Sequence, residues 1–104
     1  MSKYGNIKTI TTDGIKHDSI KEANRWCELL MLQRVGAITN LQRQVKYELL
    51  PKQGKERAVY YIADFVYTEN GNTIVEDAKG CRTEVYKLKK KMMLYFHGIK
   101  IRET

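Results

Sequence analysis

Two aspartates and a lysine are the residues of this sequence whose types and spacing could do chemistry. Asn70-Gly71 lies between two apolar runs, and Asn-Gly in that setting predicts a two-residue type I′ hairpin loop. Three cross-strand pairs follow from that loop: Val66 with Val75, Asp64 with Asp77, and Ile62 with Lys79. Opposed like charges destabilise a sheet, so the acidic pair needs a stabilising partner. A divalent cation held between the carboxylates would supply one.

Alternation of side chains along a strand decides which acids share a face. Asp77 and Lys79 share the face of Asp64, whereas Glu76 points to the other side. Opposed Cβ atoms lie about 4.5–5.5 Å apart, so both carboxylates can reach one ion. Mg²⁺ prefers oxygen ligands and keeps several waters, which predicts a site made by Asp64, Asp77 and the carbonyl of Ala78. Lys79 would then orient a metal-bound water, accept its proton or stabilise charge on a phosphate.

An alternative is that Asp64 and Asp77 lie at solvated strand ends and that Lys79 only neutralises them. Asp64 argues against this, because Tyr61-Ile62-Ala63 precede it and Phe65-Val66-Tyr67 follow it. A lone aspartate inside such an apolar run is costly to bury without a partner. The sequence therefore favours the catalytic interpretation.

The bulk composition predicts a single basic globular domain. The chain has 104 residues, of which 42% are hydrophobic and 30% charged, and its net charge is +7. We expect one domain over 1–104, with an N-terminal hairpin over 1–17 and a core over 18–102. The positive charge favours a polyanionic partner such as nucleic acid, although a basic surface kept for solubility has the same composition. No apolar run long enough to cross a bilayer and no signal-peptide pattern occurs, so we expect no membrane association and a cytoplasmic location.

The cysteines and histidines exclude several kinds of site. Cys27 and Cys81 are far apart and lie in no Cys-x-x-Cys arrangement, which favours reduced thiols over a disulfide or a zinc site. His17 and His97 are isolated, so a histidine-based nuclease site is also excluded.

Apolar periodicity and turn residues predict the elements that must position these side chains. The expected elements are a hairpin around Asp13-Gly14, a helix over 19–35 ended by Gly36, strands over 45–50, 58–67 and 73–79, a helix over 83–97 ended by Gly98, and a strand over 99–102. The first helix is expected to bury Ile20, Ala23, Cys27, Leu30 and Met31, and the second Val85, Leu88, Met92, Tyr95 and Phe96. Strand 58–67 is apolar on both faces, which is typical of a central, doubly covered strand. The fold class is therefore α/β, a mixed sheet flanked by helices.

The spacing of the acids and the order of the elements resemble the PD-(D/E)XK nuclease superfamily. Asp64 is followed thirteen residues later by Asp77-x-Lys79, after a helix that carries Glu22. The segments Asp18–Ala23, Ala63–Phe65 and Glu76–Gly80 are similar to a family of small phage and prophage proteins regarded as relatives of Holliday-junction resolvases and of phage endonuclease I. Ala63 stands where the motif has its proline, as in many members. The resemblance covers about 15–101 and implies a restriction-endonuclease-like core of the order αβββαβ.

The resemblance implies roles for four residues. Asp64 and Asp77 would bind the metal and Lys79 would assist catalysis, while Glu22 would be a further ligand or would orient metal-bound water. Glu22 has an equally good structural role, because Ser19-x-x-Glu22 is also a capping box.

Further polar residues are candidates for contacts with DNA. Arg82, Lys87, Lys90 and Lys91 follow the acidic strand and could bind phosphates, and Gln44 at the entrance of the first core strand could approach the site. Solvated basic faces and a polar strand entrance explain the same residues without DNA, and Lys89 is assigned to such a solvated face. The aromatic residues Tyr60, Tyr61, Phe65, Tyr67, Tyr95 and Phe96 are expected to pack in the core.

These observations together predict a Mg²⁺-dependent endodeoxyribonuclease in phage DNA metabolism, with Mn²⁺ as a substitute. The resemblance implies branched DNA such as a Holliday junction as substrate, and a homodimer that cuts two strands. The alternatives are a non-catalytic DNA-binding protein on the same fold, and a nuclease for linear or single-stranded DNA in recombination or packaging. An RNA-binding scaffold would require aromatic side chains exposed on the sheet, which the pattern does not favour.

Overall fold

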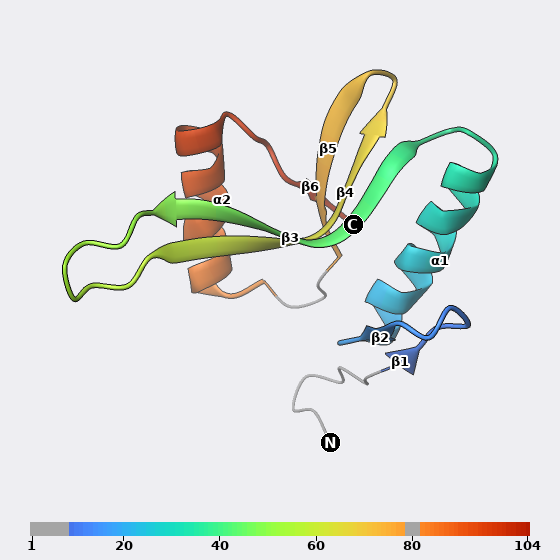
Figure 1. The fold of residues 1–104 in the computed structure, drawn as a ribbon, viewed down its shortest axis with the longest axis horizontal. Helices are drawn as coiled ribbons and strands as arrows, with labels where there is room; N and C mark the ends of the chain where they lie inside the picture. Colours follow the sequence, from blue (N-terminus) through green and yellow to red (C-terminus); the bar gives the residue numbers. More distant parts are fainter. Residues whose placement is uncertain (1–8, 79–81) are drawn as a thin grey trace.

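The elements of the protein follow the predicted order. The computed structural model describes residues 9–78 and 82–104. Its elements are β1 (Thr9–Ile10), β2 (Lys16–His17), α1 (Ile20–Arg34), β3 (Thr39–Leu50), β4 (Val59–Glu69), β5 (Asn72–Asp77), α2 (Glu84–His97) and β6 (Arg102–Glu103) (Figure 1). From α1 onward the order is helix, three strands, helix and strand, which confirms the α/β class. Within the described ranges, no helix is long and apolar enough to cross a membrane.

The main sheet is mixed and has the strand order β3-β4-β5-β6. Its strands are antiparallel except for β6, which runs parallel to β5. The β4–β5 turn is the predicted one, since Asn70 and Gly71 have φ values of 50° and 79° and Glu69 pairs with Asn72. The predicted pairing of Val66 with Val75 is confirmed.

Two strands differ in extent from the prediction. β3 begins at Thr39 rather than at position 45, because the polar segment before Val45 continues the ladder with β4. β6 comprises only Arg102–Glu103, whereas the predicted strand covered 99–102. Lys79 and Cys81 lie outside the described residues, and so does the predicted pairing of Lys79 with Ile62.

Both helices begin and end at the positions that their capping residues predict. The Ser19 hydroxyl accepts a hydrogen bond from the Glu22 amide at 3.1 Å, and the Thr83 hydroxyl accepts one from the Tyr86 amide at the same distance. Gly98 ends α2 in the left-handed conformation, with φ of 65°. The helix bounds were thus encoded locally.

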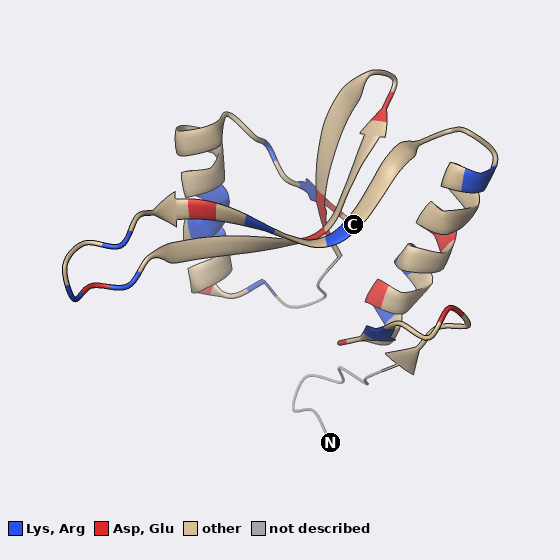
Figure 2. Ribbon diagram, in the orientation of Figure 1, with Lys and Arg blue, Asp and Glu red and all other residues tan. Residues whose placement is uncertain are grey.

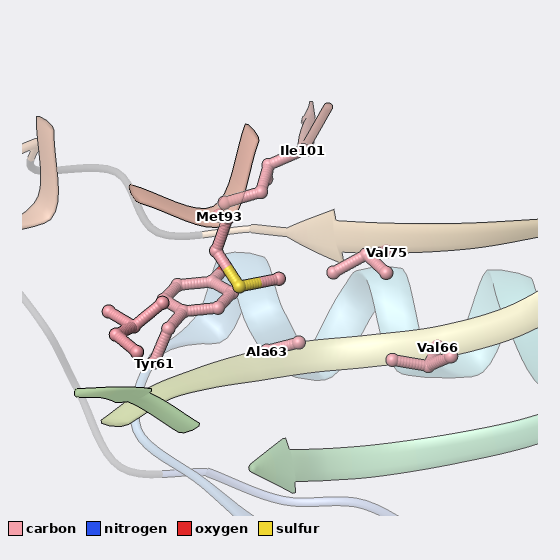
Figure 3. Packing of buried hydrophobic residues seen from close by; sticks show 7 residues of the cluster. Tyr61, Ala63, Val66, Val75, Met93 and Ile101 are labelled. Atoms are coloured by element: carbon pink, nitrogen blue, oxygen red, sulfur yellow. The ribbon is translucent and has the colours of Figure 1, made fainter. Parts of the chain in front are cut away.

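Helices α1 and α2 cover opposite faces of the sheet, with β4 between two hydrophobic clusters (Figure 1). The cluster under α2 is formed by Leu49, Tyr61, Ala63, Val66, Val75, Met93 and Ile101, most of which are labelled in Figure 3. The cluster under α1 is formed by Trp26, Leu29, Ile38, Phe65, Tyr67 and Ala78. The prediction of a doubly covered central strand is confirmed.

The predicted inner face of each helix was wrong in part. In α1, Cys27 and Met31 are exposed, whereas Trp26 and Leu29 are buried. The helix is rotated so that the Trp26 ring stacks on Phe65, with centroids 5.8 Å apart, and its Nε1 donates to Asp13. Ile20 is exposed as well.

In α2 most of the side chains predicted to face the sheet are exposed. The residue at the centre of the contact with the sheet is Met93 rather than the predicted Met92. Met93 is fully buried, with Tyr86 and Met92 partly buried beside it. The exposed apolar side chains of α2 are those of Val85, Leu88, Leu94, Tyr95 and Phe96. Tyr60 of β4 is also exposed, so the prediction that Tyr60, Tyr95 and Phe96 pack in the core was wrong.

Candidate functional site

Asp64 lies where β4 changes its orientation between the two clusters. On its N-terminal side Tyr61 and Ala63 face α2, whereas on its C-terminal side Phe65 faces α1. The Asp64 side chain is fully buried, and its Oδ2 accepts a hydrogen bond from the Ala78 amide at 2.8 Å. The β4–β5 ladder ends at the pair of Phe65 with Glu76, so the predicted pair of Asp64 with Asp77 is not part of it. The Asp64 side chain instead joins the two strands at this end of the hairpin through its bond to the Ala78 amide.

Gln44 of β3 lies opposite Asp64, between ladder pairs formed by the residues on either side of it. Its φ of 54° is in the left-handed region, which a non-glycine residue seldom adopts. Gln44 Nε2 donates to Glu22 Oε1 at 3.4 Å. Gln44 thus lies opposite Asp64 in the sheet and contacts Glu22 of α1. The alternative was a polar strand entrance with no such contact.

Asp77 is buried at the end of β5 and faces α2. The Tyr61 hydroxyl donates to its Oδ2 at 2.8 Å. Burial, and next the charge of Asp77, raise the pKa of Tyr61, and Asp64 contributes in the same direction. Tyr61 therefore stays protonated as a donor between two acids. Asp77 also pairs with Glu103 of β6.

The neighbouring acid, Glu76, points to the other face, as the alternation predicted. It is fully buried and accepts hydrogen bonds from Arg25 Nε at 2.7 Å and Arg25 Nη2 at 2.9 Å. The hydroxyls of Tyr67, at 2.6 Å, and Thr104, at 3.0 Å, also donate to it. Hydrogen bonding to Glu76 raises the pKa of Arg25, so the pair is ionic. This network ties α1 to β5.

Glu22 combines a position in the helix cap with contacts toward the site. Its amide completes the Ser19 half of the capping box, while its carboxylate contacts Gln44 and lies 3.7 Å from His17 Nδ1. Burial lowers the pKa of His17, so the histidine is neutral beside Glu22 at pH 7. The contact with Ser19 fits the role in the helix cap. Glu22, Asp64 and Asp77 are all described and form no group arranged to hold a metal ion, so the role of Glu22 as a ligand or an orienter of metal-bound water stays a prediction.

A pocket of about 450 Å³ opens beside Asp77 and reaches α2. Asp77, Gln44, Thr83 and Lys89 contribute polar groups to its lining. Asp18, the residue before the helix cap, lines it too and was not singled out by the sequence. Lys89 was assigned to a solvated face, but this pocket places it on the side of Asp77.

The lysines that were expected to contact DNA lie elsewhere on α2. Lys87, Lys90 and Lys91 line a second pocket of about 370 Å³ together with Lys100. Lys90 Nζ also lies 3.2 Å from Glu103 Oε2, and Arg82 Nε lies 2.9 Å from the same oxygen. The Tyr86 hydroxyl, with Lys90 and Arg82, lowers the pKa of Glu103 to about 2. Two residues of the predicted basic cluster, Arg82 and Lys90, are therefore paired with the Glu103 carboxylate of β6.

The arrangement of the acidic side chains is compatible with some kinds of metal site and not with others. Among residues 9–78 and 82–104, no group of three or more His, Cys, Asp or Glu side chains is arranged to hold a metal ion. Mg²⁺ is often held by one or two carboxylates with waters and substrate phosphates, and the adjacent Asp64 and Asp77 fit that pattern. A structural zinc ion takes four protein ligands and does not fit the residues described. The catalytic role of Lys79 and the ligand role of the Ala78 carbonyl stay predictions.

Several residues of the site were missed because only tertiary contacts reveal them. Tyr61 resembles any core aromatic in the sequence, and nothing there signals its bond to Asp77. Lys89 had a signal, since it lies four residues after Val85 and three after Tyr86, both of which line the same pocket.

Comparison with known proteins gives one match. No curated protein and no solved structure matches the chain. The family model described as "Protein of unknown function (DUF1064)" matches residues 1–103. The chain therefore belongs to the DUF1064 family.

Proposed function

We propose that this protein is a metal-dependent endodeoxyribonuclease. The observation that carries the proposal is a pair of buried aspartates at one end of the β4–β5 hairpin. Asp64 accepts a hydrogen bond from the amide of Ala78, and Asp77 lines a pocket together with Gln44 and Lys89. Two adjacent buried carboxylates are costly unless a cation or several donors balance them. A phosphodiester approaching such a pair needs a positive ion between its own charge and theirs.

The residues have distinct roles in this proposal. Asp64 and Asp77 hold Mg²⁺, or Mn²⁺ in its place, and Tyr61 fixes the orientation of the Asp77 carboxylate. When bound, the ion lowers the pKa of a coordinated water and neutralises charge on the phosphate. Gln44 positions a water or phosphate oxygen, and Glu22 orients Gln44. Lys79 is proposed to accept the proton of the attacking water.

The distribution of charge supports a nucleic acid as substrate. Figure 2 shows Lys and Arg on α2 and on the loop that joins β3 to β4. The chain carries a net charge of +7, and four of its twelve acids are buried, namely Glu22, Asp64, Glu76 and Asp77. Lys89 is the cation placed to contact a phosphate in the pocket of Asp77, and Lys87, Lys91 and Lys100 are placed to contact phosphates further along the strand.

Finer features of the proposal come from the resemblance to the PD-(D/E)XK superfamily. We propose that the helix–sheet arrangement is a restriction-endonuclease-like core, that branched DNA is the substrate, and that a homodimer makes two cuts. A phage protein of this kind would act in the cytoplasm of its host. The order αβββαβ from α1 onward and the mixed sheet are compatible with the first of these points, the proposed core.

A cleavage assay tests the proposal. Labelled four-way junctions and matched linear duplexes are incubated with the wild type or with Asp77→Asn in Mg²⁺, Mn²⁺ or EDTA. We expect metal-dependent cleavage by the wild type and a loss greater than about a hundredfold in the variant, because changing a residue that only supports a metal ligand already costs about 10- to 100-fold. DNA binding should be retained or tightened, since a negative charge is removed.

The second candidate is a DNA-binding protein without catalysis. It is favoured by the fact that the described residues provide no group of three metal-binding side chains. Binding of DNA without cleavage under every metal condition would support it and contradict the nuclease. Wild-type cleavage by Asp77→Asn would overturn the assignment of the site.

A further inference from the structure

The pocket beside Asp77 has an apolar wall that the proposed hydrolysis does not use. Tyr60 and Ile62 of β4 and Val85 in the first turn of α2 line it. Their exposed fractions are 37%, 45% and 63%, so none of them belongs to the core. An exposed apolar surface beside a polar site is typical of a ligand-binding surface.

The wall has a shape and a charge that select a particular kind of ligand. Tyr60 and Ile62 are two residues apart on β4 and therefore share one face of the strand. Lys46 of β3 lies over the Tyr60 ring, with Nζ 4.7 Å from the ring centroid. Lys89 lies in the same pocket. The wall thus presents an aromatic ring with one cation against it and a second cation in the same pocket, which fits a flat apolar group attached to an anion.

A nucleotide combines these two features, since its base is flat and its phosphate is anionic. In a duplex the base is paired and stacked, so it cannot reach a side chain beside the backbone. A base on Tyr60 must be unpaired or splayed. Stacking of bases on aromatic side chains is the usual means of binding single strands.

We propose that Tyr60 stacks on an unpaired nucleobase adjacent to the phosphate held at Asp77, so that the site selects DNA whose strand is unpaired or splayed at that nucleotide. This inference rests on the proposed function for the identity of the ligand. It assigns to Tyr60 a role in substrate selection, with Ile62 and Val85 as the remaining apolar contacts and Lys89 as the contact to phosphate.

Binding in EDTA tests the inference without cleavage. The wild type, Tyr60→Ala and Tyr60→Phe are titrated into labelled forked DNA and into a matched duplex. The fork carries the fluorescent base 2-aminopurine at its first unpaired nucleotide. Tyr95→Ala is the matched control, because Tyr95 is 83% exposed and does not line the pocket.

We expect Tyr60→Ala to weaken binding of the fork by about 5- to 150-fold, the range for loss of one stacked base, with little effect on the duplex. Tyr60→Phe keeps the ring and should bind as the wild type does. The wild type should change the fluorescence of 2-aminopurine, and Tyr60→Ala should not. Tyr95→Ala should match the wild type in both measurements.

Two results would overturn the inference. One is fork binding by Tyr60→Ala that equals that of the wild type, and the other is an equal loss for fork and duplex. Failure of the proposed function has a different signature: the wild type would cut no DNA in Mg²⁺ or Mn²⁺, while the dependence of fork binding on Tyr60 would persist.

Discussion

Glu76 and Asp77 are neighbours on β5, both are buried, and their surroundings differ. Glu76 faces α1 and accepts four hydrogen bonds from Arg25, Tyr67 and Thr104. Asp77 faces α2, accepts a hydrogen bond from Tyr61, and lines a pocket of about 450 Å³. The strand thus directs one acid to a saturated ionic network and the next acid toward an opening.

The difference indicates that Glu76 is a structural acid and that Asp77 is the acid which, under the proposed function, binds the metal. Glu76 stabilises the junction of α1 and β5, and this junction fixes the helix that carries Glu22. Asp77 lines a pocket, which is the feature that the proposed metal site requires of it. Each prediction below changes one side of this comparison.

The largest expected effect is on the side of Glu76. Arg25→Met removes the guanidinium and leaves a buried carboxylate without its ionic partner. We expect the free energy of unfolding, measured with urea, to fall by about 3–5 kcal/mol. Arg34→Met is the control on the same helix, since Arg34 is exposed in the last turn and should cost less than about 1 kcal/mol. Equal losses for the two variants would contradict the role of Arg25.

The next effect distinguishes the two acids through their tyrosines. Tyr61→Phe and Tyr67→Phe each remove one hydroxyl that donates to a buried carboxylate, to Asp77 and Glu76 respectively. Both should lose about 1.5–3 kcal/mol of stability, the range for hydrogen bonds to charged groups. Under the proposed function, only Tyr61→Phe should slow metal-dependent cleavage, by about 10- to 100-fold, because Tyr61 contacts the proposed metal ligand Asp77 and Tyr67 does not.

The measurement is cleavage per folded molecule at a temperature where both variants are fully folded. Equal rates for the two variants would show that the tyrosines do not separate the roles of the acids.

The smallest effect concerns Glu103, the ladder partner of Asp77. Its pKa in the folded protein is about 2, below the ordinary value of 4.5, so the unfolded chain binds the proton more readily. The stabilisation is therefore complete above pH 4.5 and is lost as the pH falls toward 2. Glu103 is partly exposed, and its share should be about 1 kcal/mol or less.

Thermal unfolding of Glu103→Gln checks this sign. The variant should be less stable than the wild type at pH 6, and the difference should shrink between pH 4.5 and pH 2. A constant difference over that range would exclude the titration of Glu103 as its cause.

The parts of the fold that depend on neighbouring residues were predictable from the sequence. Asn70-Gly71 specified both the turn and the register, and Ser19, Gly36, Thr83 and Gly98 specified the ends of the helices. The opposite orientations of Glu76 and Asp77 followed from alternation in a short strand.

The parts that depend on packing were not predictable in the same way. Apolar residues surround much of α1, and the stacking of Trp26 on Phe65 decided which of them became buried. Arg25 and Glu76 are 51 residues apart, and no local pattern links them. The positive φ of Gln44 has no signal in its residue type, although it brings Gln44 to Glu22.

Binding of Mn²⁺ tests the central claim most directly, namely that Asp77 is a metal ligand. Titration calorimetry compares the wild type with Asp77→Asn and with Asp18→Asn, which removes another acid of the same pocket. We predict binding by the wild type and by Asp18→Asn, and a loss of binding in Asp77→Asn. Equal binding by all three proteins, or an equal loss in both variants, would contradict the claim.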